Sequence, residues 1–264
     1  MFAKILVGTD GSETAKLAVS HAAHLAAALG SELVVATAHG DRRGRRHPSA
    51  SPADDPQAAI ARALLRDAAQ AHGADVRVRA VAVPGPAGEA LVELAAREAV
   101  DLVVVGNRGM GRAAWAPLSS VPDRVSHRTP VCVLIVDTMD GRPPGYRRIL
   151  VGTDGSASSE RAVEVAVSLA GRLGAEVAAA TAGENEGAAS AALAPVRSRW
   201  PGLATLVAHG PPATALVNLA ESGTYDLLVV GSRGFAGPRR LLGSVPDRVA
   251  HEARTSVLIV ATAG

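Results

Sequence analysis

The sequence predicts an α/β fold built from two tandem copies of one module, each a five-stranded, mostly parallel open sheet with helices on both faces. Internal repetition is the first observation, because three blocks occur twice in the same order and at similar spacing. These blocks are KILVGTDGS (4–12) and RILVGTDGS (148–156), DLVVVGNRG (101–109) and DLLVVGSRG (226–234), and SVPDRV (120–125 and 244–249). Within each copy, short apolar runs alternate with segments of helical periodicity, which is typical of parallel strands joined by helices.

The first copy opens with a short apolar strand at 5–7 that ends at Gly8. A helix is expected from about Ser12 to Gly30, because apolar side chains recur every four residues and the glycine supplies a C-terminal stop. The elements expected after it are strands at 33–38 and 76–83, a helix at 87–99, a strand at 102–105, a helix that begins near Ser120, and a strand at 131–136.

The second copy repeats this alternation after a turn-rich linker, DGRPPG (140–145). We therefore expect one domain at 1–140 and another at 146–264. The strands expected in the second copy are 149–151, 177–181, 203–208, 227–230 and 257–260, with helices up to Leu173, near 214–221 and from Ser244.

Composition restricts the classes of function. Hydrophobic residues make up 48% of the 264 residues, enough for a buried core, and the formal net charge of +2 gives no broad electrostatic case for nucleic acid. Cys132 is the only cysteine, which excludes an internal disulfide. No signal peptide is visible, and no stretch reaches the ~20 apolar residues that span a bilayer. We expect a cytoplasmic protein with no membrane or nucleic-acid partner.

An aspartate follows the first strand of each copy. Ligands of parallel sheets bind at the carboxyl ends of strands, near the point where the strand order switches. Asp10 and Asp154 fall there, where a carboxylate can accept hydrogen bonds from an adenine amine or a ribose hydroxyl. The alternative is a local role in the Asp-Gly-Ser sequence, as a helix N-cap or a turn residue.

Glycine pairs follow the fourth strand of each copy. Gly106 and Gly109 in the first copy, and Gly231 and Gly234 in the second, would let backbone N–H groups approach a phosphate without a Cβ atom in the way. A tight turn is an equally good explanation of the same glycines.

Positive charge and helix starts lie close to these glycines in the sequence. Arg108 and Arg233 could add charge to a phosphate site. Ser120 and Ser244 stand where the next helices begin, and a helix N-terminus offers free N–H donors to an anion. The alternative for the two serines is an ordinary N-cap.

With these motifs, the sequence resembles the universal stress protein family, whose ATP-binding members carry an Asp after the first strand and G-x2-G-x9-G-[S/T] after the fourth. The resemblance covers both copies apart from the linker and residues 41–57. It implies that the Asp contacts the nucleoside, that the glycine-rich run cradles phosphates, and that the end of the second strand backs the adenine. The binding residues that it implies are Asp10, Ala38, Gly106, Arg108, Gly109, Ser120 and Val121 in the first copy, and Asp154, Ala182, Gly231, Arg233, Gly234, Gly243, Ser244 and Val245 in the second.

Both copies depart from that pattern. In the first, Ser119 stands where the family has the glycine before Ser120, and a side chain there can crowd a phosphate. In the second, only eight residues (235–242) separate Gly234 from Gly243, and one missing residue can shift a loop by up to ~3.3–3.6 Å.

The resemblance implies a regulatory protein rather than an enzyme, with ATP or AMP as its ligand, with or without Mg²⁺. It also implies that the last strands, 131–136 and 257–260, join the two copies into a pseudo-dimer, and that two chains form a homodimer. A scaffold that binds partners without nucleotide and a slow ATPase are the alternatives.

Other chemistries lack the residues that they need. There is no G-x4-G-K-[S/T], no H-E-x-x-H, no paired-cysteine metal motif and no G-x-S-x-G nucleophile turn. His127 and His251 each stand four residues after an aspartate, which helical spacing explains. Cys132 in its apolar strand is most simply a buried small residue. The charged, Pro- and Ser-rich segment 41–57 reads as a solvated loop.

Overall fold

The computed structural model describes residues 1–39, 76–107, 121–139, 141, 143–232 and 244–261. The chain divides into two compact units, Phe2–Gly145 and Tyr146–Gly264, which we call the first half and the second half. The division falls at the end of the expected linker. Segment 41–57 lies outside the described residues.

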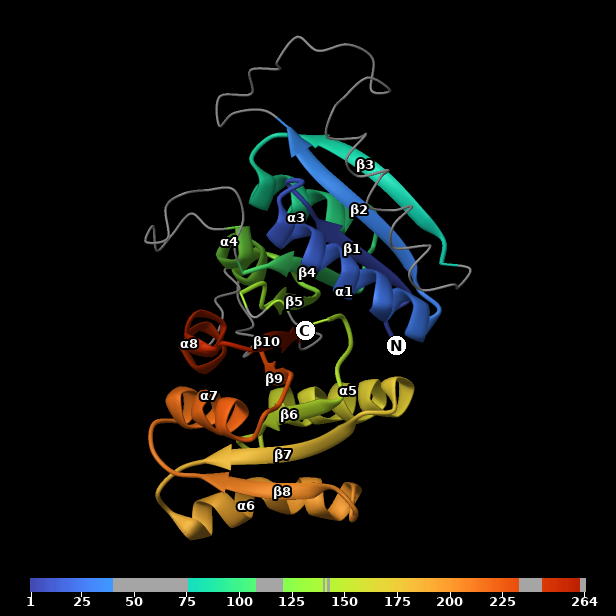
Figure 1. The fold of residues 1–264 in the computed structure, drawn as a ribbon. Helices are drawn as coiled ribbons and strands as arrows, with labels where there is room; N and C mark the ends of the chain where they lie inside the picture. Colours follow the sequence, from blue (N-terminus) through green and yellow to red (C-terminus); the bar gives the residue numbers. More distant parts are fainter. Residues whose placement is uncertain (40–75, 108–120, 140, 142, 233–243, 262–264) are drawn as a thin grey trace, which may run out of the picture. The chain divides into compact units, whose positions relative to one another are not determined.

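The first half alternates strands and helices in the expected order (Figure 1). Its elements are β1 (Lys4–Gly8), α1 (Glu13–Leu29), β2 (Glu32–His39), β3 (Val78–Pro84), α3 (Ala87–Arg97), β4 (Leu102–Gly106), α4 (Val121–Arg128) and β5 (Cys132–Val136). The strand order is β3-β2-β1-β4-β5 and every pairing is parallel. Helix α1 covers one face, and α3 and α4 cover the other.

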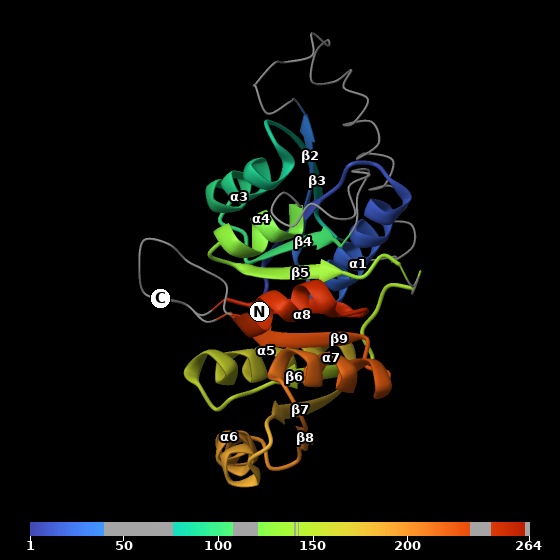
Figure 2. The ribbon, with the colours of Figure 1, turned by 90° about the vertical axis from the view of Figure 1, so that its left-hand side faces the viewer.

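The second half repeats this architecture, as a second view confirms (Figure 2). Its elements are β6 (Arg148–Gly152), α5 (Ala157–Leu173), β7 (Glu176–Ala182), α6 (Glu186–Arg199), β8 (Ala204–Ala208), α7 (Pro212–Ser222), β9 (Leu227–Gly231), α8 (Ser244–Glu252) and β10 (Ser256–Val260). The strand order, β10-β9-β6-β7-β8, is again fully parallel. The predicted fold class is therefore confirmed in both halves.

The first helix of each half has the caps that the sequence indicates. The Ser12 side chain accepts a hydrogen bond from the Ala15 N–H at 3.2 Å, and α1 ends at Gly30 in the left-handed conformation with φ of 69°. In the second half, Ser156 and Gly174 cap α5 in the same way, Gly174 with φ of 66°. Glycine adopts that conformation without steric cost, so both helices end where the sequence predicts.

Aliphatic side chains of the central strands form the two cores. Those of β1 and β4, and of β6 and β9, are almost completely excluded from solvent, as expected for sheets covered on both faces. Cys132 is a correction to our expectation, because it is half-buried rather than buried. It is the first residue of β5, where the strand emerges from the core. Among the described helices, none is long and apolar enough to cross a membrane.

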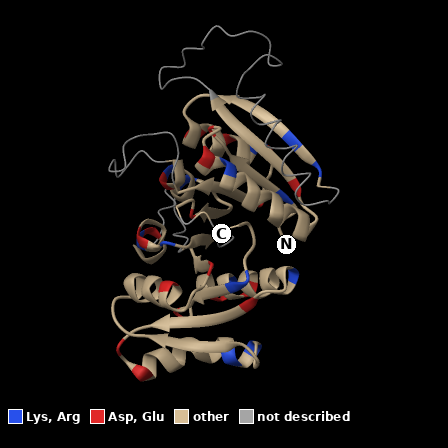
Figure 3. Cartoon of the chain, in the orientation of Figure 1, with Lys and Arg blue, Asp and Glu red and all other residues tan. Residues whose placement is uncertain are grey.

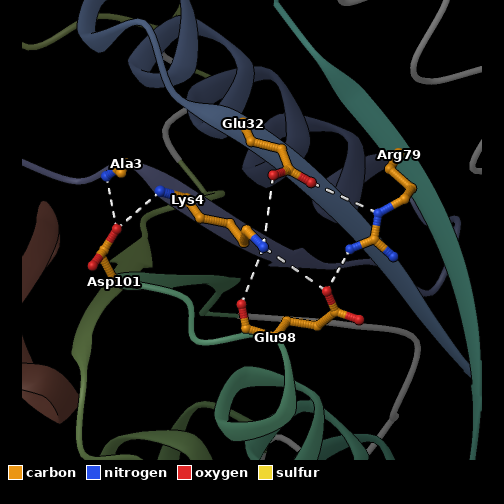
Figure 4. Close-up of polar contacts among 6 residues, drawn as sticks. All are labelled: Ala3, Lys4, Glu32, Arg79, Glu98 and Asp101. Carbon is orange, nitrogen blue, oxygen red and sulfur yellow. Dashed lines mark hydrogen bonds and ion pairs between the residues drawn. The ribbon is translucent and has the colours of Figure 1, made fainter.

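An aspartate before the fourth strand of each half fixes the start of the first strand. The carboxylate of Asp101 accepts hydrogen bonds from the main-chain N–H groups of Ala3 at 2.7 Å and Lys4 at 2.9 Å (Figure 4). In the second half, the carboxylate of Asp226 accepts hydrogen bonds from the N–H groups of Arg147 at 2.8 Å and of Arg148, the first residue of β6, at 3.0 Å. These aspartates lie at the amino edge of the sheets, opposite the edge where ligands are expected.

A basic residue at the start of the first strand of each half donates a hydrogen bond to a carbonyl at the end of a helix, at the same edge of the sheet. Lys4 Nζ donates to the Glu98 carbonyl at the end of α3 (3.1 Å) and lies 3.6 Å from a Glu32 carboxylate oxygen. Arg79 joins the cluster through a 2.6 Å bond to Glu98 (Figure 4). Arg148 replaces Lys4 in the second half and donates to the carbonyl of Gly223 at 2.6 Å. Figure 3 shows how charges of both signs are interspersed in each half.

Candidate functional site

The expected ligand edge is assembled from three strands in each half. In the first half, Gly8 pairs with Ala36 and Val7 with Val104. Asp10 lies two residues beyond Gly8, and Ala38 lies two residues beyond Ala36. Gly106 lies two residues beyond Val104. The strand order switches between β1 and β4, so Asp10 and Gly106 follow the two strands on either side of the switch.

The second half places its counterparts at the same points. Gly152 pairs with Ala180, and Asp154 and Ala182 again lie two residues further on. Gly231 ends β9, which adjoins β6 at the switch in strand order. The sequence therefore predicted correctly which edge of the sheet these residues share.

Each aspartate has one carboxylate oxygen held by the serine two residues later. Asp10 Oδ1 accepts hydrogen bonds from the Ser12 N–H at 3.0 Å and the Ser12 hydroxyl at 2.6 Å. Asp154 Oδ1 accepts from the same groups of Ser156 at 3.0 and 2.5 Å. The serine is the helix N-cap and the aspartate is a turn residue, so of the two local roles the turn role applies. The result is a carboxylate in a fixed orientation at the sheet edge.

The threonine before each aspartate continues the strand and supports the turn. The Thr9 N–H donates to the Ala36 carbonyl at 2.9 Å, and the Thr153 N–H donates to Ala180 at 2.8 Å. Each threonine hydroxyl then accepts the N–H of the next glycine at 3.2 Å. That glycine adopts a positive φ in both halves, 80° and 78°, which explains why the sequence repeats Thr-Asp-Gly-Ser without change.

Gly231 is required by helix packing. A Cβ atom on Gly231 would lie 2.6 Å from the main-chain oxygen of Ser158, in the first turn of α5. The Ser158 hydroxyl donates a 2.6 Å hydrogen bond to the main-chain carbonyl of Ser232. The close approach of α5 therefore accounts for this glycine, in addition to any role toward a phosphate.

The residue after the glycine differs between the halves. Asn107 in the first half bridges to the end of β5, since its amide donates to Asp137 at 2.8 Å and its side-chain oxygen accepts from the Thr138 hydroxyl at 2.7 Å. Ser232 in the second half bonds through both its N–H (2.8 Å) and its hydroxyl (3.0 Å) to the carbonyl of Val260. The main-chain anchor is the same in both halves, because the Asn107 N–H also donates to the last residue of the neighbouring strand, Val136, at 2.9 Å. The two halves therefore differ only in the side-chain bonds of this residue.

The histidines after the last helical motif have a local explanation, as predicted. His127 Nδ1 lies 2.8 Å from the main-chain oxygen of Asp123, and His251 Nδ1 lies 2.7 Å from that of Asp247. Both are i,i+4 contacts within α4 and α8. In the part of the chain that the structure describes, no three His, Cys, Asp or Glu side chains gather as a metal site.

Several expected site residues lie outside the described part of the chain. Val121, Ser244 and Val245 are described, and they stand in the first turns of α4 and α8. The residues outside are Arg108, Gly109, Ser119 and Ser120 in the first half, and Arg233, Gly234, 235–242 and Gly243 in the second.

Three residues at this edge were not singled out from the sequence. Ser158, Ser159 and Asn107 all use their side chains here, and Ser159 Oγ lies 3.0 Å from Thr153 Oγ1. The sequence feature that could have pointed to Ser158 and Ser159 is their place in the first turn of the helix that follows the Thr-Asp-Gly-Ser turn. Their partners are too distant in the sequence to be read from it, because Ser158 and its acceptor stand 74 residues apart.

Fold and edge together define a class of protein: tandem α/β modules with a carboxylate and a glycine at the switch in strand order. The family model described as the universal stress protein family matches residues 1–137, 145–198 and 178–261. The chain belongs to the universal stress protein family.

Relatives in this family match one half or most of the chain. Universal stress protein Rv1636 of Mycobacterium tuberculosis is 37% identical over 140 residues, which are 51% of this chain and 95% of that protein. Universal stress protein Rv2623 of the same organism is 33% identical over 200 residues, or 67% of this chain and 66% of that protein.

Two solved structures of universal stress proteins are similar to this chain, and the first has the same fold over nearly its whole length. A universal stress protein from Archaeoglobus fulgidus has a TM-score of 0.73 at 20% identity, covering 97% of this chain and 95% of that one. A universal stress protein solved in complex with cAMP is 36% identical, covers 52% of this chain and 98% of that one, and has a TM-score of 0.45.

Proposed function

We propose that this universal stress protein is a regulatory protein that binds ATP or AMP and changes its conformation or its partners in response. The observation that carries the proposal is the repeated position of Asp10 and Asp154, each beside the switch in strand order and each with one carboxylate oxygen held by a serine. Membership of the family supports it, as does the glycine that ends the neighbouring strand in each half.

The groups at this edge suit the parts of an adenine nucleotide. An oriented carboxylate can accept hydrogen bonds from an adenine amine or a ribose hydroxyl. Ala38 stands one residue before the end of β2 and Ala182 is the last residue of β7, and their small side chains suit a neighbouring flat base. The N-terminus of α8, which starts at Ser244, has a dipole that favours a nearby phosphate.

Isothermal titration with ATP, AMP and cAMP tests the proposal, and cAMP is included because a relative has been solved with it. We expect binding of ATP or AMP at one or two sites per chain, and loss of one site in Asp10→Ala or Asp154→Ala. Mass spectrometry of ligand released from freshly purified, denatured protein gives a second readout. If no nucleotide copurifies and none binds at millimolar concentration, the proposal is wrong.

A scaffold that works without nucleotide is the second candidate. Helix packing already accounts for Gly231, which removes part of the case for a phosphate site in the second half. Ser119 and the eight-residue spacing at 235–242 point the same way. Nucleotide that survives purification would contradict this candidate, whereas partners captured equally well with and without ATP would favour it.

The remaining parts of the proposal concern activity, assembly and location. We infer that the protein binds nucleotide without turning it over, so phosphate release from ATP should not exceed background. We also propose a pseudo-dimer of the two halves and a homodimer of chains, for which light scattering should give twice the 26.7 kDa chain mass. We place the protein in the cytoplasm, which cell fractionation can check.

A further inference from the structure

The first turn of α5 spans the switch in strand order in the second half. On one side, the Ser156 hydroxyl bonds to Asp154 at 2.5 Å, and Ser159 Oγ lies 3.0 Å from Thr153 Oγ1 at the end of β6. On the other side, the Ser158 hydroxyl donates to the Ser232 carbonyl at 2.6 Å, just past the end of β9. One helical turn is therefore bonded to both of the strands between which a ligand is expected.

The contact with β9 is close as well as hydrogen-bonded. A Cβ atom on Gly231 would lie 2.6 Å from the Ser158 main-chain oxygen and 2.8 Å from its hydroxyl. Only glycine lets the turn approach this far, so the bond is built into the packing of the helix on the strand. The Ser232 N–H is bonded in turn to Val260 at 2.8 Å, which leaves the end of β9 held on two sides.

The first half has a different arrangement at the matching position. Thr14 corresponds to Ser158 in the repeat, but its hydroxyl lies 3.0 Å from Ser12 Oγ, within its own helix turn. The end of β4 is held by Asn107, whose side chain bonds to Asp137 and Thr138 after β5. The Ser158 bond is thus a feature in which the two copies differ, and Thr14 provides a natural control.

From these contacts, we propose that Ser158 is a positioning residue for nucleotide in the second half, because its bond to Ser232 fixes the separation of the Asp154 carboxylate from the end of β9. This inference rests on the proposed function. A site whose groups are already held in place loses less conformational freedom when a ligand binds, so the bond raises affinity without touching the nucleotide.

The test is site-resolved hydrogen exchange of the full chain, followed by mass spectrometry. Exchange of peptides that cover residues 152–160 and 226–232 reports the second half, and exchange of peptides that cover 8–16 and 102–107 reports the first. The proteins are wild type, Ser158→Ala and the control Thr14→Ala, each without nucleotide and across a titration with AMP and with ATP. Thermal melting of each variant measures any general loss of stability.

We expect Ser158→Ala to speed exchange at 226–232 without nucleotide. It should also raise the half-saturating nucleotide concentration at 152–160 by about two- to tenfold, the range for loss of one neutral hydrogen bond. In Ser158→Ala, the titration midpoint of the first half should stay unchanged. Thr14→Ala should leave the midpoints of both halves within about twofold of the wild type, since this substitution removes only a bond within its own helical turn.

Other outcomes separate this inference from the function on which it rests. If the wild type shows no protection by AMP or ATP in either half, the proposed function fails and the inference fails with it. If nucleotide protects the wild-type second half and Ser158→Ala has the same midpoint, the inference alone is overturned. A lower melting temperature with an unchanged midpoint would assign Ser158 a purely structural role and would also overturn it.

Discussion

Carboxylates of single aspartates fix main-chain geometry at both edges of each sheet. At the carboxyl edge, Asp10 and Asp154 bind the serine two residues later and orient a turn. At the amino edge, Asp101 and Asp226 accept the two N–H groups that open the first strand. A charged acceptor makes stronger hydrogen bonds than a neutral one, so each of these bonds matters more than an ordinary main-chain contact.

Replacement of Asp101 by Asn tests the amino-edge bonds. The variant keeps the shape of the side chain but loses the charge that strengthens the bonds to Ala3 and Lys4, so we expect a loss of about 1–3 kcal/mol in the free energy of unfolding. Urea denaturation measures it. Glu93→Gln, at an exposed position of α3, is the control and should change stability by less than ~0.5 kcal/mol. Equal effects of the two substitutions would contradict this role.

Thr37 offers a stabilising substitution. Its hydroxyl is buried in β2 with no hydrogen-bond partner among the described residues, and its side chain is 1% exposed. Thr37→Val replaces an unpaired polar atom by a methyl group of similar size and should raise the free energy of unfolding by about 1 kcal/mol. The contrasting variant is Thr9→Val, which removes the acceptor of the Gly11 N–H and should be destabilising. A lower melting temperature for Thr37→Val would show that the hydroxyl is bonded in solution.

Tyr146 gives stability a dependence on alkaline pH. Burial raises the pKa of Tyr146 well above its ordinary value, and a hydrogen bond with the Ser256 side chain opposes part of the rise. Above about pH 10, the unfolded chain loses this phenolic proton while the folded chain retains it, so the free energy of unfolding falls as pH rises. In Tyr146→Phe, the free energy of unfolding should fall less steeply between pH 9 and 12 than in the wild type, as measured by denaturation followed by circular dichroism. Parallel curves for the two proteins would refute this assignment.

At the scale of elements, close contacts between helices and strands depend on glycine. Gly152 lies under Leu216 of α7, where a Cβ atom would come within 2.8 Å of the end of a flexible side chain. Gly231 lies under α5, where the obstacle is the main-chain oxygen of Ser158. A side chain can rotate away from a clash, but a helix backbone must move as a whole.

This difference predicts unequal costs for two similar substitutions. Gly231→Ala should destabilise by more than Gly152→Ala, by roughly 1–3 kcal/mol in excess, because α5 must shift. Differential scanning calorimetry of both variants measures the difference. If Gly231→Ala were as stable as the wild type and only nucleotide binding suffered, helix packing would not be the reason for this glycine.

At the scale of the whole molecule, the duplication supplies matched pairs of positions. Leu6 and Leu150 occupy the same place in the repeated strand, and each is fully buried in its own half. Alanine at either position removes the same atoms from an equivalent environment and should cost about 2–5 kcal/mol. Urea denaturation should therefore rank the two variants within ~1 kcal/mol of each other. A larger gap would mean that the two cores are packed to different quality.

The sequence predicted the class of fold and the edge of the sheet that the repeated aspartates and glycines share, since both follow from short-range patterns that occur twice. It did not predict α6, because Ala189, Leu193 and Val196 form a sparse apolar stripe among alanines and Pro195 lies inside the helix. It also did not predict the bonds of Ser158 and Asn107, whose partners are distant in sequence. Local sequence patterns are enough to predict turns such as Thr-Asp-Gly-Ser. Contacts at the ends of strands depend on how the helices pack on the sheet, which local patterns do not determine.

The aspartates of the amino edge have a practical consequence for protein engineering. Asp101 and Asp226 bind the start of the first strand at the edge opposite the expected ligand. A library of substitutions at the carboxyl edge would therefore leave these hydrogen bonds intact. Each half then provides a separate display surface on the same scaffold. Selection could pursue one new specificity in the first half and another in the second, within a single chain.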